Sequence, residues 1–144
     1  MKKFILLILL LSSLFTEAQK LDLCLRIGKH YISFQWVSMK YFGTAIITRT
    51  KETGTYNIIG SHYSKTNSDY LKIQGTLKPL TEKHLVFDGF IDTKIKYINN
   101  GMNCHREGKF NFKVSGERQY WRLQEMSNPC DSVTDYIDIY FMGP

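Results

Sequence analysis

The 144-residue sequence has only three prolines and contains no linker, low-complexity tract or internal repeat. Beyond the N-terminal segment no window shows a helical apolar stripe, which argues against a helical bundle or an alternating α/β fold. No later segment is apolar enough to cross a bilayer as a helix. The net charge of +6 could favour an anionic partner such as an acidic glycan. Because no block of five or more like charges occurs, a soluble protein with surplus lysine is the favoured interpretation.

Catalytic and metal-binding motifs are also absent. The sequence contains no C-x-x-C, H-x-x-x-H, H-E-x-x-H or G-x-S-x-G pattern and no glycine-rich phosphate loop. Asp88 and Asp92 lie on one strand face, but nearby lysines make this a solvated charged face. A small envelope hydrolase therefore has only His62, His105 and Asp92 as candidate residues. We predict no catalytic residue, no cofactor and no metal.

The N-terminal residues "MKKFILLILLLSSLFTEAQ" have the layout of a secretory signal peptide. Two lysines precede an apolar run too short for a permanent membrane span, and a small-x-small cleavage site ends at Ala18. We predict a signal at residues 1–18 and one β-domain at residues 19–144. The alanine-glutamine junction resembles signals of Gram-negative Bacteroidota, which implies a bacterial protein that is periplasmic or secreted. We expect no transmembrane segment after cleavage and no nucleic acid as a partner.

Alternation of apolar and polar residues dominates the rest of the chain, as in half-buried β-strands. It occurs in "LDLCLRI", "YISFQWVS", "DYLKIQGTLKP", "KFNFKV" and "DYIDIYF", and turn residues such as "NNG" and "SGE" separate the runs. In "YISFQWVS", Ile32, Phe34 and Trp36 are predicted to share one face. The pattern predicts an all-β antiparallel domain of about nine strands. Short connections favour a meander that closes as a barrel over a two-sheet sandwich.

The stretch "TGTYNIIGSHY…DYLKIQGTL" resembles the glycine-tyrosine hairpins of avidin-like and lipocalin-like barrels. The resemblance covers some twenty-odd residues and implies a barrel architecture without implying a ligand. The several tryptophans of the avidin vitamin pocket and the N-terminal G-x-W of lipocalins are both missing.

Three cysteines occur, at positions 24, 104 and 130. Cys104 ends the "NNGMN" turn and Cys130 lies in the turn-rich "SNPCD", with a hairpin between them. Because a hairpin returns the chain near its start, we predict a Cys104–Cys130 disulfide, the usual state of cysteine in an exported protein. Cys24 is left free or pairs with another molecule. Cys104 and the adjacent His105 point in opposite directions, which disfavours a shared metal.

Aromatic residues are the one compositional excess, at 14%. In "ERQYWRLQ", Trp121 and Leu123 share one face and Tyr120 and Arg122 share the other. Tyrosine and arginine displayed together on a sheet are suited to recognition of sugars, peptides or proteins. Ordinary cross-strand pairing that stabilises the sheet is the alternative. With Arg106 expected across the hairpin and two tyrosines off the core face of the last strand, the candidate binding residues are Tyr120, Arg122, Arg106, Tyr136 and Tyr140.

Three functions remain open from the sequence. The first is an exported, non-catalytic barrel that binds a small ligand, a glycan or a partner protein. It predicts either a dry apolar pocket inside the barrel or an exposed tyrosine and arginine patch outside. The second is an envelope interaction protein of the inhibitor or immunity type, with acidic residues such as Asp131, Asp135 and Asp138 directed at the partner. The third is the small hydrolase.

Overall fold

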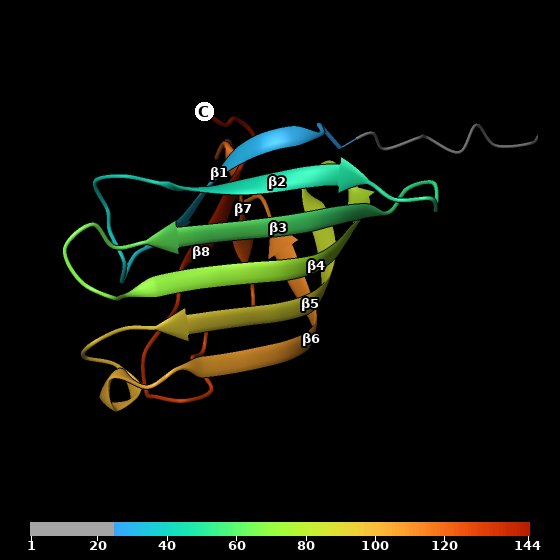
Figure 1. Cartoon of the computed structure of the whole chain (residues 1–144). Coiled ribbons are helices and arrows are strands. Elements are labelled where there is room, and N and C mark those ends of the chain that lie inside the picture. The colour runs from blue at the N-terminus through green and yellow to red at the C-terminus, as the bar shows by residue number, and fades with distance from the viewer. Residues whose placement is uncertain (1–24) are drawn as a thin grey trace, which may run out of the picture.

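The computed structural model describes residues 25–144, which form an all-β, closed antiparallel barrel of eight strands. Each strand pairs with its neighbours in sequence, and β8 pairs with β1 to close the barrel. The predicted meander barrel is therefore confirmed (Figure 1). The strands are β1 (Gly28–Phe34), β2 (Gly43–Arg49), β3 (Tyr56–Tyr63), β4 (Tyr70–Thr81), β5 (His84–Lys94), β6 (Cys104–Lys113), β7 (Tyr120–Leu123) and β8 (Ile137–Tyr140). A short 3-10 turn, η2 (Asn99–Gly101), precedes β6.

The difference between eight strands and the expected nine arises at the start of the domain. Most of the first expected strand, residues 21–27, lies outside the described residues, as do the predicted signal segment and Cys24. The described part, Leu25 to Ile27, is not in a strand, and β1 begins at Gly28, whose φ of +107° favours glycine. No helix in residues 25–144 is long and apolar enough to span a membrane.

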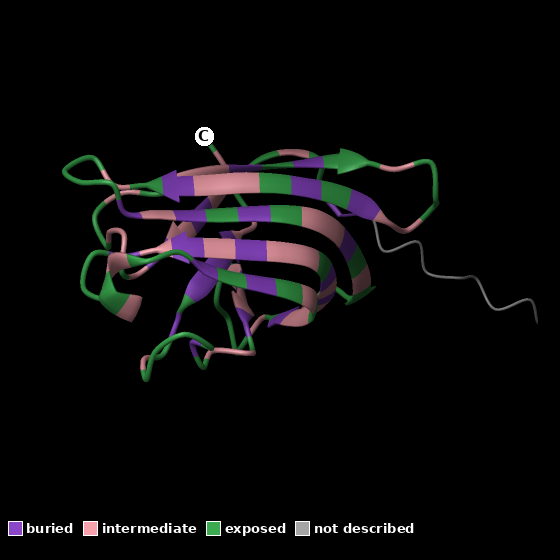
Figure 2. Cartoon of the chain, turned by 60° about the horizontal axis from the view of Figure 1, so that its bottom comes forward, coloured by how far each residue is buried: buried purple, intermediate pink, exposed green. Residues whose placement is uncertain are grey.

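The barrel interior is a packed core. Burial alternates along the strands because successive side chains point to opposite faces (Figure 2). Phe34, Phe87 and Phe112 are fully buried and are surrounded by aliphatic side chains from all around the barrel. Trp36, predicted to share this interior face, is 40% exposed because β1 ends at Phe34 and the chain turns. The interior of the barrel is thus a packed hydrophobic core.

A row of three glycines crosses the long strands of the barrel. Gly75 of β4 lies opposite Gly89 of β5, which lies opposite Gly108 of β6. The Phe87 ring covers Gly75 and Gly89: a Cβ atom on Gly75 would lie 2.8 Å from Phe87 Cε2, and one on Gly89 would lie 2.9 Å from Cζ. Such close packing of backbone and ring requires glycine and lets the strands bend around the core.

Replacement of Gly75 or Gly89 by alanine should therefore destabilise the barrel by at least about 2 kcal/mol, since the added methyl group meets both the neighbouring backbone and the Phe87 ring. Urea denaturation monitored by circular dichroism measures the loss. Gln74→Ala, an exposed neighbour on β4, is the control and should change stability by no more than about 0.5 kcal/mol. Equal stability of G75A and Q74A would contradict the tight packing.

Candidate functional site

Barrel closure brings polar residues of four strands into one transverse row on the outer surface. Lys113 of β6 lies opposite Arg122 of β7, Arg122 lies opposite Asp138 of β8, and Asp138 lies opposite Ser33 of β1. These side chains face outward because their neighbours along β7 and β8 are buried in the core. The row places a carboxylate between a guanidinium and a hydroxyl group.

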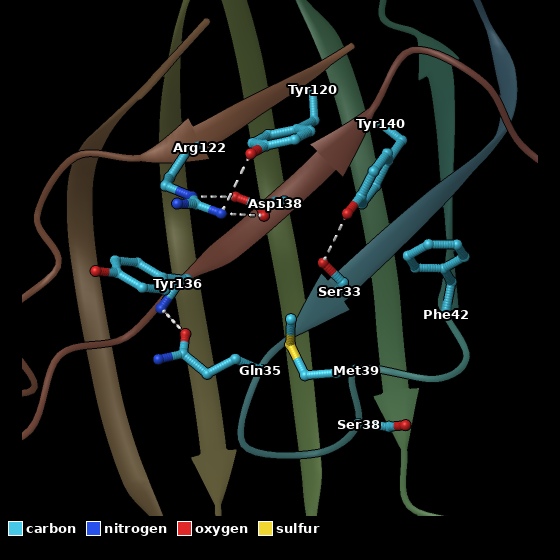
Figure 3. A pocket seen from close by; sticks show the side chains of 10 residues that line it. All are labelled: Ser33, Gln35, Ser38, Met39, Phe42, Tyr120, Arg122, Tyr136, Asp138 and Tyr140. Carbon is cyan, nitrogen blue, oxygen red and sulfur yellow. Dashed lines mark hydrogen bonds and ion pairs between the residues drawn. The ribbon is translucent and has the colours of Figure 1, made fainter. Parts of the chain in front are cut away.

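Arg122 and Asp138 form the ion pair at the centre of this surface. Arg122 donates from Nε to Oδ1 at 2.7 Å and from Nη2 to Oδ2 at 2.8 Å, a bidentate arrangement. These hydrogen bonds raise the pKa of the Arg122 guanidinium, so it stays charged. The guanidinium lies 4.3 Å from the ring centroid of Tyr136 and 5.2 Å from that of Tyr120. Two aromatic rings therefore hold the ion pair in a fixed position (Figure 3).

Aromatic rings continue from this pair across β8 to β1. The ring centroids of Tyr120 and Tyr140 lie 5.2 Å apart, those of Tyr140 and Phe42 4.9 Å, and those of Phe42 and Tyr31 5.2 Å. Ser33 Oγ donates to the Tyr140 hydroxyl at 3.4 Å. The result is a continuous aromatic ladder beside hydrogen-bonding groups (Figure 3).

Tyr120, Tyr140 and Phe42 of this ladder line a hollow of about 240 Å³, the aromatic hollow. Its wall includes four residues predicted from the sequence: Tyr120, Arg122, Tyr136 and Tyr140. The other lining residues, which are not among the candidate binding residues predicted from the sequence, are Ser33, Gln35, Ser38, Met39, Phe42 and Asp138. Asp138 could have been found by its period-two spacing from Tyr136 and Tyr140, whereas the loop residues carry no such signal.

Arg106 does not belong to this hollow, so its expected place beside Tyr120 and Arg122 is wrong. β6 and β7 pair only through Phe112 with Leu123 and Lys113 with Arg122, at the far end of β6 from Arg106. Arg106 is 6% exposed and forms a buried ion pair with Asp135. Alternate residues of β6 point into the barrel, and Arg106 is one of them. The ladder between β6 and β7 is only two residue pairs long, so it does not reach Arg106.

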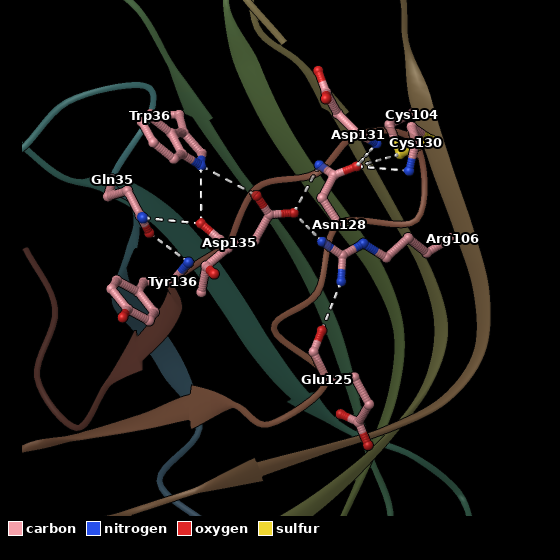
Figure 4. Close-up of polar contacts among 11 residues, drawn as sticks. Gln35, Trp36, Cys104, Arg106, Glu125, Asn128, Cys130, Asp131, Asp135 and Tyr136 are labelled. Atoms are coloured by element: carbon pink, nitrogen blue, oxygen red, sulfur yellow. Dashed lines mark hydrogen bonds and ion pairs between the residues drawn. A yellow bond between two sulfur atoms is a disulfide. The ribbon is translucent and has the colours of Figure 1, made fainter. Parts of the chain in front are cut away.

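The Arg106–Asp135 pair anchors the loop that carries Tyr136 into the aromatic hollow (Figure 4). Arg106 also donates to the carbonyl oxygen of Glu125 at 2.9 Å, while Asp135 accepts from Asn128 at 3.0 Å and from Trp36 Nε1 at 3.2 Å. Burial raises the pKa of the Asp135 carboxyl, and the Arg106 charge opposes that shift. The two charges compensate each other, as a buried pair requires.

The same loop carries the disulfide between Cys104 and Cys130, whose Cα atoms lie 5.9 Å apart. Asn128 Oδ1 accepts from the backbone nitrogens of Cys130 at 2.8 Å and Asp131 at 3.0 Å. Disulfide and ion pair thus fix the loop between β7 and β8 at adjacent points (Figure 4). The disulfide joins the pair of cysteines that the hairpin argument predicts.

Two of the three hydrolase candidates, His105 and Asp92, lie in contact, whereas His62 is buried. His62 is fully buried, and its Nδ1 accepts from the backbone nitrogen of Phe34 at 3.1 Å. His105 lies on the outer face of β6, with Nδ1 2.5 Å from Asp92 Oδ1 and Nε2 3.3 Å from Glu107 Oε2. The two carboxylates contact both ring nitrogens and raise the pKa of His105, the hydrogen bond with Asp92 most. No group of three or more potential metal ligands occurs within residues 25–144.

The fold and surface define a class: a small closed β-barrel with a filled interior and an external aromatic-arginine hollow. The sequence profile of the PM1083 family matches residues 17–141, and the chain belongs to this family. It is 42% identical over 132 residues to the uncharacterized protein PM1083 of Pasteurella multocida (strain Pm70), a match that covers 90% of this chain and 83% of the relative. No solved structure matches the chain.

The buried ion pair gives a first prediction for this region. Arg106→Met should cost about 3–5 kcal/mol of unfolding free energy, because it leaves the Asp135 carboxylate buried without its cation. Asp135→Asn should have a cost of similar size, and the double variant should cost clearly less than the sum of the two. Urea denaturation of the parent protein, the two single variants and the double variant gives a double-mutant cycle. If the losses in unfolding free energy were additive, the two side chains would not interact directly.

The His105 cluster gives a second prediction. The imidazole should titrate above 6.5 in the folded protein and return toward 6.5 in Asp92→Asn, as followed by NMR with His105→Gln used for assignment. Because the folded pKa is raised, the stabilisation from this contact is complete below pH 6.5 and is lost as the pH rises through the folded pKa. An unchanged titration in D92N would contradict the carboxylate contact as its cause.

Proposed function

We propose that this chain is an exported, non-catalytic β-barrel protein that binds a saccharide in the aromatic hollow. The observation that carries the proposal is the ladder of aromatic rings beside the bidentate Arg122–Asp138 pair. Sugar rings present apolar C–H faces that pack on aromatic rings and hydroxyl groups that hydrogen-bond to charged side chains. The hollow supplies both kinds of contact within one small volume.

The rigidity of the hollow supports binding rather than structural pairing alone. Gln35 Oε1 accepts from the backbone nitrogen of Tyr136, and Gln35 Nε2 donates to the carbonyl oxygen of Thr134 at 3.1 Å. The rings are therefore positioned before a ligand arrives, which lowers the entropic cost of binding. The packed interior supports the outer surface as the site, because Phe34, Phe87 and Phe112 fill the space that an internal ligand would need.

Two features support export. The first 18 residues have the composition of a signal peptide, and the Cys104–Cys130 disulfide is typical of oxidising compartments. A periplasmic or extracellular location would place the hollow among cell-surface glycans.

A partner protein is the second candidate for the same surface. Met39 is 83% exposed and Phe42 49% exposed on the rim of the hollow, and arginine and tyrosine are common in the energetic centres of protein interfaces. This alternative includes an inhibitor or immunity-type interaction in the envelope. It predicts that substitutions on the rim weaken partner binding as much as substitutions in the aromatic ladder do.

The proposal is tested by NMR titration of the isotope-labelled mature protein with a panel of neutral and acidic saccharides. Tyr140→Ala should weaken binding at least tenfold, or about 1.4 kcal/mol, because it removes the ring at the centre of the ladder. Tyr140→Phe should retain most of the affinity, since it keeps the ring. Tyr97→Ala, which removes an exposed tyrosine outside the hollow, is the matched control.

Shifts confined to the aromatic hollow in the parent protein and absent in Y140A would support the saccharide site. Equal affinities of Y140A and Y97A would argue against it. Loss of a protein complex in Met39→Ser, without any saccharide binding by the parent protein, would favour the partner-protein alternative.

A further inference from the structure

A second hollow of about 260 Å³ adjoins the aromatic hollow. The two share Tyr120, Arg122 and Tyr136 as a common wall. The remaining lining residues come from the end of β6, the β6–β7 turn and the segment after β7: Lys113, Ser115, Arg118, Gln124 and Met126. We call this second space the basic hollow.

Cations outnumber carboxylates around the shared wall. The guanidinium carbons of Arg118 and Arg122 lie 5.8 Å and 5.2 Å from the centroid of the same Tyr120 ring. Lys113 lies directly opposite Arg122 in the β6–β7 register. Asp138 is already held by Arg122 in the bidentate pair. Within residues 25–144 neither Lys113 nor Arg118 forms an ion pair, so their charges remain uncompensated.

Nearby acidic side chains do not supply the missing negative charge. Glu125, just after β7, accepts hydrogen bonds from the backbone and side-chain nitrogens of Asn111 at 2.9 Å and 2.8 Å. Neither Glu125 nor Glu117 lines the basic hollow. Like charges on opposing strand positions repel each other, and an anion placed between them removes that repulsion.

The turn between β6 and β7 fixes the position of these cations. Gly116 has a φ of +58°, and the backbone nitrogen of Arg118 donates to the carbonyl oxygen of Ser115 at 3.4 Å. The turn therefore holds Arg118 and Ser115 on the same side as the shared wall, where both line the hollow. A charged group bound here would meet a guanidinium, an ammonium and a hydroxyl group.

We infer that the ligand of this surface is an acidic saccharide, with its sugar ring in the aromatic hollow and its anionic group in the basic hollow. This inference rests on the proposed function and names its ligand class. A carboxylate or a sulfate supplies the same chemistry: oxygen atoms that accept charge-assisted hydrogen bonds from Arg118 and Lys113. The shared wall of Tyr120, Arg122 and Tyr136 makes the two contacts continuous.

The test measures binding of the mature chain to three immobilised polymers by biosensor: polygalacturonate, dextran sulfate and neutral dextran. Lys113→Gln/Arg118→Gln removes the two uncompensated cations. Lys51→Gln/Lys78→Gln, at exposed positions outside both hollows, makes the same change in net charge and is the control. Tyr140→Ala tests the aromatic hollow in the same assay.

At least one acidic polymer should bind at least tenfold more tightly than dextran, and the polymer preferred identifies a carboxylate or a sulfate. K113Q/R118Q should weaken that binding at least tenfold, K51Q/K78Q less than threefold, and Y140A at least tenfold. Equal weakening by both charge variants would overturn the inference, because it would show general attraction of a polyanion.

The remaining outcomes separate the two proposals. Equal binding of dextran and the acidic polymers, with loss in Y140A, would overturn the acidic ligand and leave the saccharide function standing. Acidic binding that is lost in K113Q/R118Q but unchanged in Y140A would overturn the saccharide function and, with it, the inference. Binding of none of the three polymers would overturn both.

Discussion

Closure of the barrel through β8 is the constraint on which the outer surface depends. This four-residue strand pairs with β1 on one side and with β7 on the other. Its buried Ile137 and Ile139 belong to the core, while the alternate residues Asp138 and Tyr140 face the hollow. The strand therefore contributes at once to the core and to the aromatic hollow. Without this closure, Arg122 would lose its carboxylate and Tyr120 would lose its aromatic neighbour.

The loop that precedes β8 is held in place by two contacts with β6. The Arg106–Asp135 pair and the Cys104–Cys130 disulfide both tie this loop to β6, the strand that borders the basic hollow. Ion pairs buried in this way specify a position more than they add stability. Here they specify where Tyr136 lies, and the Tyr136 ring in turn covers the Arg122 guanidinium. Residues that do not line the hollow thus help to determine its geometry.

The core and the proposed binding surface lie on opposite faces of the same strands. The packed interior and its glycine row give the barrel its shape. The outer face of β6, β7, β8 and β1 is then free to carry rings and charges that a core would not accept. The proposed acidic saccharide would contact only this outer face, so variants of the hollow can change binding while the barrel remains folded.

The sequence by itself determined the fold class and four of the ten residues that line the aromatic hollow. Period-two alternation places Tyr120 and Arg122 on one face of β7, and Tyr136 and Tyr140 on the outer face at β8, because side-chain direction in a strand is a local property. Turn residues around Cys104 and Cys130 likewise indicated the disulfide. Tertiary structure alone decided which strands meet and in what register. Arg106 fell inside, Trp36 left the core face, and Phe42 and Gln35 reached the hollow from a loop. These placements depend on pairing between distant segments, and the alternation of a single strand carries no information about its partner.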